Sequence, residues 1–129
     1  METTIQKTAI KTFRDLIVWQ KSMLMVTCIY EATKSFPREE NYGMVSQIRR
    51  SAISIPSNIA EGYGRNTTNE YLRFLQITIG SLFELQTQVE IALNLHYVSE
   101  KQYQTLFEQT REIERMVSSL ISKLNENNY

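Results

Sequence analysis

Residues 42–65 read YGMVSQIRRSAISIPSNIAEGYGR, and the apolar spacing within this stretch predicts one long helix. Apolar residues recur at alternating steps of three and four: Val45, Ile48, Ala52, Ile55 and Ile59. This spacing places them on one helical face and is typical of the seam of a helical bundle. The sequence therefore predicts a helix over about residues 42–61, with Gly62 and Gly64 supplying the positive φ that commonly ends a helix.

A polar stripe runs beside this apolar seam. Its members recur at steps of four and three: Gln47, Ser51, Ser54, Asn58 and Glu61. Small side chains let a second helix approach closely, and their hydroxyls bond across the contact. Pro56 removes a backbone donor, which predicts a bend and a freed carbonyl at Ala52 that nearby serine and asparagine side chains satisfy. The stripe either sets the register between helices or faces a neighbouring subunit or a ligand, and we expect the subunit.

Periodicity and helix caps predict three further helices. They cover about residues 15–35, 68–95 and 100–124. Their expected capping pairs are Thr12 with Asp15, Thr67 with Glu70, and Ser99 with Gln102. Short loops between sequential helices favour antiparallel neighbours. The sequence thus predicts an all-α protein, an antiparallel up-down-up-down four-helix bundle over residues 13–125, with flexible segments at residues 1–12 and 126–129.

Apolar stripes identify the expected core faces of these helices. The first helix is expected to bury Leu16, Trp19, Met23, Val26 and Tyr30. The fourth is expected to bury Tyr103, Leu106, Ile113, Val117, Leu120 and Leu124. The third carries one stripe of Tyr71, Leu75, Leu82, Leu85, Val89 and Ala92 and a second of Leu72, Ile79, Phe83 and Leu93. Two stripes exceed what one bundle core needs, so we expect a subunit contact and a homo-oligomer.

Charge limits the classes of partner. Fourteen basic and fourteen acidic residues cancel in a chain of 129, so no general attraction to nucleic acid or anionic membrane is expected. The two signs are unevenly distributed, because residues 1–73 carry ten basic and seven acidic residues and residues 74–129 carry four and seven. This imbalance either forms a basic face or is neutralised by pairing between the two halves.

Cysteine usage and hydropathy indicate the compartment. A single cysteine, Cys28, allows no internal disulfide and fits a reducing environment. The first residues lack an apolar core of signal-peptide length, and no apolar run of membrane-spanning length follows. We therefore expect a soluble, cytoplasmic protein with no membrane partner.

No constellation of catalytic or metal-binding residues emerges. The sole histidine, His96, has no partner at metal-ligand spacing and is expected to mark the end of the third helix. Cys28 lies on another helix and is expected to be a small core residue. The sequence GYGR lacks both the preceding strand and the ending of a phosphate-binding loop. We expect no enzyme, no metal and no cofactor.

Four arginines are the strongest candidates for a binding site. They are Arg49, Arg50, Arg65 and Arg73, and Tyr63 and Tyr71 are interleaved with them. Arginine with aromatic side chains grips phosphates and stacks on unpaired bases. The alternative is that these arginines pair with acidic residues of the same or a neighbouring subunit.

Three strings carry a resemblance to a known family: FRDLIVWQKS, FPREENYGMVSQIRRSAISIPSNIAEGYGR and FLQITIGSLFELQTQVEIA. Over roughly residues 13–124 they resemble the 23S rRNA-intervening-sequence proteins, also called S23-type four-helix-bundle proteins. The central string is long and specific. The resemblance supplies no agreed catalytic residues.

The resemblance implies a small bacterial four-helix bundle that assembles as a homopentamer. A related branch, the accessory variability determinants of diversity-generating retroelements, forms a pentameric barrel that binds nucleic acid and a reverse transcriptase. Those proteins are strongly basic, whereas this chain has a net charge of zero, which weakens the expectation of nucleic-acid binding. We expect a non-enzymatic homopentamer that presents its arginines to an RNA or other nucleic acid, or alternatively a protein–protein adaptor or scaffold.

Overall fold

The computed structural model describes residues 9–126 and forms four long helices in that range. The helices are α1 (Ile17–Thr33), α2 (Met44–Tyr63), α3 (Thr68–Asn94) and α4 (Glu100–Glu126). Two short 3-10 turns, η2 (Phe13–Asp15) and η3 (Arg38–Glu40), precede α1 and α2. Flexible segments were predicted for residues 1–12 and 126–129, and of these residues 1–8 and 127–129 lie outside the described part of the chain.

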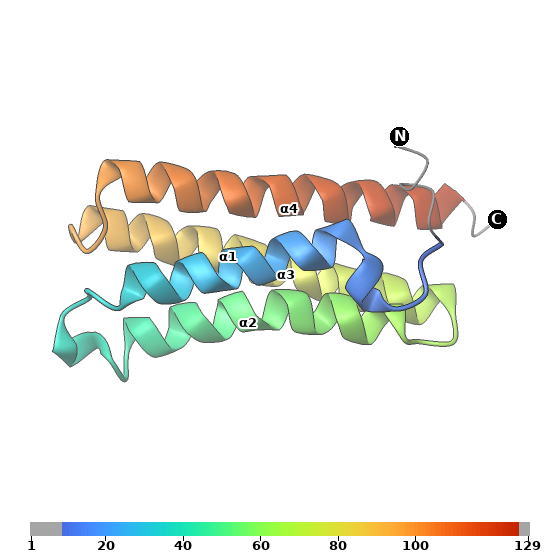
Figure 1. The fold of residues 1–129 in the computed structure, drawn as a ribbon, viewed down its shortest axis with the longest axis horizontal. Coiled ribbons are helices and arrows are strands. Elements are labelled where there is room, and N and C mark those ends of the chain that lie inside the picture. Colours follow the sequence, from blue (N-terminus) through green and yellow to red (C-terminus); the bar gives the residue numbers. More distant parts are fainter. Residues whose placement is uncertain (1–8, 127–129) are drawn as a thin grey trace.

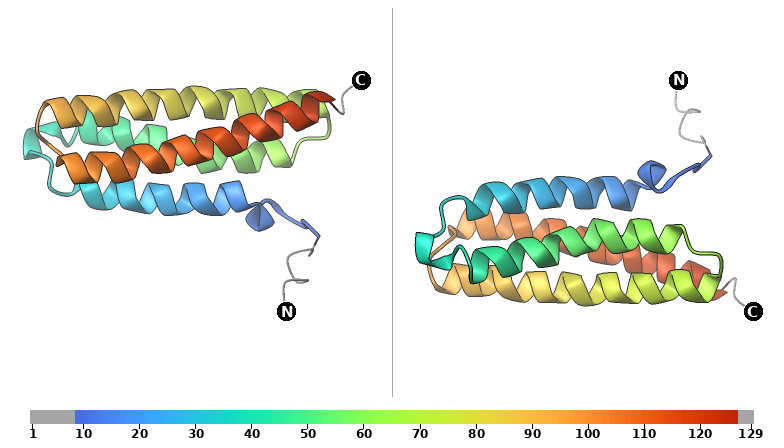
Figure 2. Two further views of the ribbon diagram at one scale, coloured as in Figure 1. Left: turned by 90° about the horizontal axis from the view of Figure 1, so that it is seen from above. Right: turned by 90° about the horizontal axis from the view of Figure 1, so that it is seen from below.

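Each helix runs antiparallel to the one before it, so the chain passes up, down, up and down along one bundle (Figure 1). Helix α1 packs against α2 and α4, and α3 packs against α2 and α4 (Figure 2). The diagonal pairs do not pack against each other in the described part of the chain. The predicted all-α four-helix bundle is therefore confirmed.

Side-chain caps define the starts of α3 and α4 as predicted, but not the start of α1. Thr12 and Asp15 form a reciprocal capping box, but it caps the short η2 turn. The following residue, Leu16, is extended with ψ of 124°, so α1 begins later than the predicted residue 15. Thr67 accepts the Glu70 N–H at 3.1 Å at the start of α3. At the start of α4, Ser99 and Gln102 bond reciprocally at 2.8 and 3.0 Å.

The core lies along the bundle axis and uses the predicted faces of α2, α3 and α4. The whole α2 seam is buried, and so is the first α3 stripe apart from the half-buried Tyr71. In α4, Leu106, Ile113 and Val117 are buried, and the other predicted residues pack at the edge of the core. Apolar periodicity therefore identified these faces correctly.

The predicted core face of α1 is wrong by about one residue. The buried residues are Val18, Ser22, Met25, Ile29, Ala32 and Thr33. Met23 is exposed, and Leu16, Trp19, Val26 and Tyr30 are only half-buried. Both stripes have helical spacing, so the choice between them depends on which one α2 and α4 cover. The large aromatic residues of the predicted stripe make edge contacts instead, and Trp19 packs against Phe13 with ring centroids 5.1 Å apart.

The predicted role of the two glycines after the α2 seam is also wrong. No glycine among the described residues has a positive φ, and Gly64 has φ of −82°. Gly62 is buried inside α2, where a Cβ atom would lie 2.7 Å from the Cβ of Phe74 and 3.1 Å from Tyr71 Cδ1. Gly62 is therefore required because α2 and α3 approach closely there, and not because the chain turns.

Candidate functional site

The polar stripe of α2 lies at the contact between α2 and α3 of the same chain. The hydroxyls of Ser54 on α2 and Ser81 on α3 are hydrogen-bonded to each other at 2.7 Å. Ser51 is buried and bonds to the backbone of its own helix, while Gln47 and Glu61 are exposed. The centre of the stripe thus sets the register between two helices of one protomer. The exposed Gln47 and Glu61 and the half-buried Asn58 are left on the surface for a subunit contact or a ligand.

Helix α2 continues through Pro56 without interruption from Met44 to Tyr63. Two side chains bond to backbone carbonyls around the proline: the Ser54 hydroxyl donates to the Ser51 carbonyl at 2.8 Å, and Asn58 Nδ2 donates to the Ser54 carbonyl at 2.7 Å. Neither bond reaches the Ala52 carbonyl that the proline deprives of its helical donor. The polar residues therefore support the neighbouring turns and not the carbonyl that we expected them to satisfy.

The four candidate arginines form two separate groups and not one cluster. Arg49 and Arg50 lie in the first half of α2, whereas Arg65 follows the end of α2 and Arg73 lies in the first turns of α3. At about 1.5 Å of rise per residue, the length of α2 separates the two groups by about 20 Å. They therefore occupy different parts of the surface.

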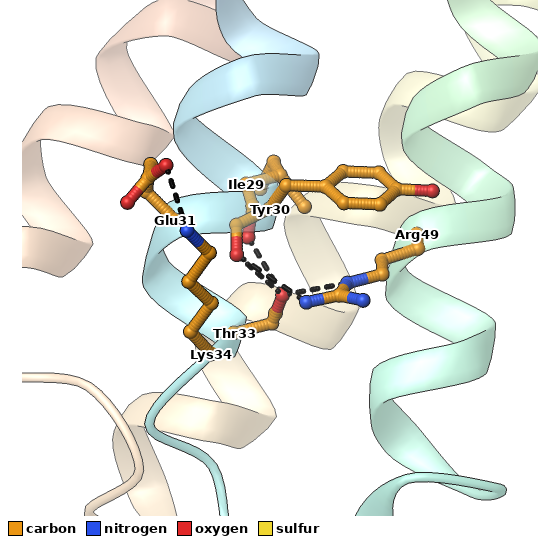
Figure 3. Close-up of polar contacts among 6 residues, drawn as sticks. All are labelled: Ile29, Tyr30, Glu31, Thr33, Lys34 and Arg49. Carbon is orange, nitrogen blue, oxygen red and sulfur yellow. Dashed lines mark hydrogen bonds and ion pairs between the residues drawn. The ribbon is translucent and has the colours of Figure 1, made fainter.

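Arg49 is held in place by α1. Its Nε donates to Thr33 Oγ1 at 2.9 Å, and its Nη2 donates to the Tyr30 carbonyl at 3.3 Å (Figure 3). Its guanidinium carbon also lies 4.3 Å from the centroid of the Tyr30 ring. The buried Thr33 hydroxyl itself donates to the Ile29 and Tyr30 carbonyls. Arg49 is thus primarily an α1–α2 connector whose remaining N–H groups stay available.

Arg50 and Tyr42 lie on the open side of Arg49. A groove of about 620 Å³ between α1 and α2 is lined by Tyr30, Asn41, Tyr42, Val45, Ser46, Arg49, Arg50, Ile53 and Ser54. The Tyr42 residue is 99% exposed, and Arg50 is exposed and makes no ion pair within the described residues. No carboxylate lines this groove. We call it the basic groove.

Sequence reasoning missed Tyr30 and Tyr42 as members of this site. The sequence predicts Tyr30 in the core and Tyr42 at the start of a helix, and neither prediction places a ring at the surface. The available signal was an aromatic residue between Asn41 and Gly43 in a polar loop, because such a residue has no core to enter.

Arg65 and Arg73 are more constrained than Arg50. Arg65 pairs with Glu61 at 3.3 Å, and its guanidinium lies 4.6 Å from the centroid of the Phe74 ring. Arg73 lies 5.2 Å from the same centroid. The interleaved tyrosines pack against each other, with the Tyr63 and Tyr71 rings 6.2 Å apart and nearly perpendicular. This end of the bundle therefore has charge but no free aromatic face.

Pairing between the two halves of the chain does not neutralise the charge imbalance. Among the described residues, Lys21–Glu112 is the one ion pair that joins residues 1–73 to the later half, at 3.0 Å. The other three pairs join residues three or four positions apart on the same or adjoining turns. Helices α1 and α2 themselves carry three basic residues, Lys21, Arg49 and Arg50, and two acidic residues, Glu31 and Glu61, so their basic excess is one charge.

Two apolar surfaces are exposed in the described protomer. A hollow of about 360 Å³ between α1 and α2 is lined by Trp19, Met23, Val26, Ile53, Pro56, Ser57 and Ala60. On the outer face of α3, Ile77, Gly80, Ile91 and Leu95 are exposed at helical spacing, with the exposed Glu84 and Thr87 between Gly80 and Ile91. A Cβ atom at Gly80 would meet nothing within 4 Å. The second stripe predicted on α3 is divided, because Ile79 and Leu93 pack against the core whereas Phe83 is half-exposed.

The residues that could act in catalysis or bind a metal ion do not lie close to one another. Cys28 is half-buried and receives a contact from Gln109 Nε2 at 3.4 Å. His96 ends α3 with φ of 64°, and the Tyr97 N–H bonds back to the Ala92 carbonyl at 2.8 Å. Within residues 9–126, no three His, Cys, Asp or Glu side chains are grouped so as to hold a metal ion. None of the described helices is long and apolar enough to cross a membrane.

Fold and surface together define a small antiparallel four-helix-bundle protein with a basic, aromatic groove on one side. A family model described as 23S rRNA-intervening sequence protein matches residues 14–119. The chain belongs to this family, as the resemblance of its central string indicated.

A solved structure supports both the fold and the family. The chain is similar to a protein with unknown function from the S23 ribosomal protein family of Bacteroides thetaiotaomicron VPI-5482. The two share 25% sequence identity and a TM-score of 0.77, and the match covers 82% of this chain and 96% of that one. Neither this neighbour nor the family carries the name of an enzyme. No curated protein matches the sequence.

Proposed function

We propose that this protein is a non-enzymatic, cytoplasmic homo-oligomer, with a pentamer as the form that the family resemblance implies, and that it presents arginines to an RNA partner. The observation that carries the assembly is the exposed row of Ile77, Gly80, Ile91 and Leu95 on α3. A glycine in the middle of a helix costs about 0.5–1 kcal/mol relative to alanine. Nothing in the protomer requires Gly80, so its absent side chain leaves room for another chain.

The second exposed surface supplies a receiving site for that row. The hollow between α1 and α2 has an apolar lining that includes Trp19, Met23 and Ile53. It differs from the convex α3 row, so contact between them joins unlike surfaces. Such head-to-tail contacts close into rings when the rotation between subunits permits. A contact between unlike surfaces is the kind that a cyclic pentamer requires, whereas a two-fold dimer pairs like surfaces.

Light scattering at micromolar concentration tests the assembly. The wild type is expected to be an oligomer, and Ile77→Asp is expected to dissociate it because a carboxylate would be buried at the contact. Phe83→Asp is the comparison variant, since Phe83 is exposed on α3 and belongs to the second stripe predicted there. A monomeric wild type would refute the assembly. If Phe83→Asp dissociates the oligomer and Ile77→Asp does not, the subunit contact lies on the second stripe predicted on α3, which contains Phe83.

The RNA part rests on the uneven charge of the bundle and on its exposed arginines. It is tested by binding to RNA from the region that flanks the gene, at two salt concentrations. Phosphate contacts release counterions, so affinity must fall as salt rises. Affinity that is independent of salt would exclude phosphate recognition.

The second candidate is a protein–protein adaptor, which the net charge of zero favours. Replacing Arg50 and Arg65 with glutamine distinguishes the two functions. RNA binding is lost if the arginines contact phosphates, whereas the contacts of an adaptor are largely retained. Arg49 is omitted from this double variant because it joins α1 to α2.

A further inference from the structure

We propose that the basic groove is a binding site for a single-stranded nucleic acid, in which Arg49 and Arg50 hold a phosphate and Tyr42 stacks on the adjacent unpaired base. This inference rests on the RNA partner proposed above and names both the site and the form of the strand. It also assigns the Arg65–Arg73 end of the bundle a minor role.

Arg49 is a preorganised cation. Its Nε and one Nη2 donor are committed to Thr33 and Tyr30, and the Tyr30 ring lies against its face. Guanidinium carries five N–H donors, so the rest of Nη2 and all of Nη1 have no bond within the described residues. A cation already fixed in place loses little conformational entropy when an anion binds. Figure 3 shows the guanidinium lying between the carbonyl end of α1 and the adjoining face of α2.

Arg50 has no competing carboxylate in the basic groove. Arg50 is exposed, and the described residues offer it no ion pair. The groove lining contains two arginines and no carboxylate. Glu40, in the preceding turn, is occupied by the Met44 N–H at 3.2 Å and the Tyr97 hydroxyl at 2.9 Å. A phosphate is therefore the anion that completes the hydrogen bonding of this pair.

Tyr42 is the most exposed aromatic residue that lines the basic groove. A tyrosine that is 99% exposed contributes nothing to the core of the protomer and offers a ring face to solvent. Bases that are not paired stack on such rings, whereas bases inside a duplex are already stacked on their neighbours. Tyr42 therefore selects single strands. The groove volume of about 620 Å³ lies within the usual range of ligand sites.

The other arginine group, Arg65 and Arg73, is less suited to bind a strand. Arg65 pairs with Glu61, and both Arg65 and Arg73 lie against the ring of the buried Phe74. A phosphate there must displace a carboxylate, and no exposed ring is available for a base. At the Arg49–Arg50 site no carboxylate has to be displaced, and the Tyr42 ring is already exposed.

Fluorescence anisotropy with a labelled single-stranded RNA of mixed sequence tests the groove. The comparison ligands are the matching RNA duplex and a DNA strand of the same sequence. The DNA strand shows whether the ribose 2′-hydroxyl contributes to the affinity. We expect the wild type to prefer the single strand. Tyr42→Ala is expected to weaken binding at least about fivefold, and Tyr42→Phe to preserve it, because stacking needs the ring and not the hydroxyl. Arg50→Gln is expected to weaken binding and to reduce the salt dependence by about 0.7 in the log–log slope.

Arg65→Gln and Arg115→Gln are the matched controls, and both should bind as the wild type does. Tyr42 and Arg50 are exposed, so their replacement leaves the fold intact. Light scattering on each variant ensures that lost binding does not result from dissociation. Loss of binding in Arg65→Gln with none in Tyr42→Ala or Arg50→Gln would overturn the groove and leave the RNA function standing. A wild type that binds no RNA or DNA strand would overturn both, with the assembly unaffected.

Discussion

The Nε of Arg49 lies 2.9 Å from Thr33 Oγ1, and this bond joins two helices through a threonine that is otherwise buried. Thr33 in turn donates to the carbonyl of Ile29 at 2.9 Å. An arginine that sequence analysis assigned to a ligand is thus part of the contact between α1 and α2. Its removal affects stability before it affects binding.

Arg49→Gln is expected to reduce the free energy of unfolding by about 1–3 kcal/mol, since hydrogen bonds to charged groups contribute about 1.5–3 kcal/mol and the Tyr30 contact adds to them. Arg50→Gln, at the next position, should change it by less than about 0.5 kcal/mol. Urea denaturation monitored by circular dichroism measures both. Equal effects of the two substitutions would contradict the bridging role.

Ile55→Ala is expected to cost about 2–5 kcal/mol, because Ile55 is fully buried and its truncation leaves a cavity. Ile53 is the matched control on the same helix, at 43% exposure. Its replacement by alanine should cost less than about 1 kcal/mol. The comparison is made by denaturant unfolding in the Ile77→Asp background, so that a subunit contact at Ile53 does not contribute.

Gly62→Ala is expected to destabilise the protein by about 1–3 kcal/mol, because the new Cβ atom would lie 2.7 Å from the Phe74 Cβ and the helices must separate. Gly80→Ala should instead stabilise the protomer by about 0.5–1 kcal/mol, since the Cβ meets open space and helix propensity improves. Thermal unfolding in the Ile77→Asp background measures both without a subunit contact. Stabilisation by Gly62→Ala would show that the α2–α3 approach is looser than described.

His96→Gly is expected to raise stability by up to about 1 kcal/mol, because His96 has φ of 64° at the end of α3 and glycine adopts this region without steric cost. Leu95→Gly is the control, since Leu95 has φ of −89° and gains nothing from glycine. The unfolding midpoint in urea should move up for the first variant and down for the second. The opposite order would indicate that the His96 side chain itself is needed.

The Asp15 carboxylate accepts the Lys11 and Thr12 backbone N–H groups at 2.9 and 3.1 Å, and these bonds lower its pKa. A lowered pKa in the folded state stabilises the protein above the ordinary value of about 3.9, and this contribution disappears as pH falls through the folded value. The difference in melting temperature between wild type and Asp15→Asn should therefore be present above about pH 4 and disappear as pH falls further, through the lowered pKa of Asp15 in the folded protein.

Glu108→Gln serves as the control for this pH dependence, because Glu108 is exposed and makes no hydrogen bond or ion pair within the described residues. Its substitution should produce no comparable acid step. A wild-type advantage over Asp15→Asn that persists unchanged in acid would show that shape, and not ionisation, makes Asp15 effective.

Much of the candidate site was accessible from sequence, but its arrangement was not. The arginines and the small-residue stripe were identified by residue type and spacing. Their division into two groups depends on the length of α2, and the commitment of Arg49 depends on a threonine sixteen residues earlier on another helix. Tyr42 emerged as a site residue only because no helix covers it.

The sequence by itself determined the four helices, the N-terminal caps of α3 and α4 and the buried seam of α2. These features follow from local rules, since helical periodicity and capping depend on residues within a few positions of each other. Tertiary structure alone decided which α1 stripe is buried, why Gly62 is needed and which arginine is free. Each of these depends on contact with a second helix, and two apolar stripes on one helix are equivalent until a neighbour covers one of them.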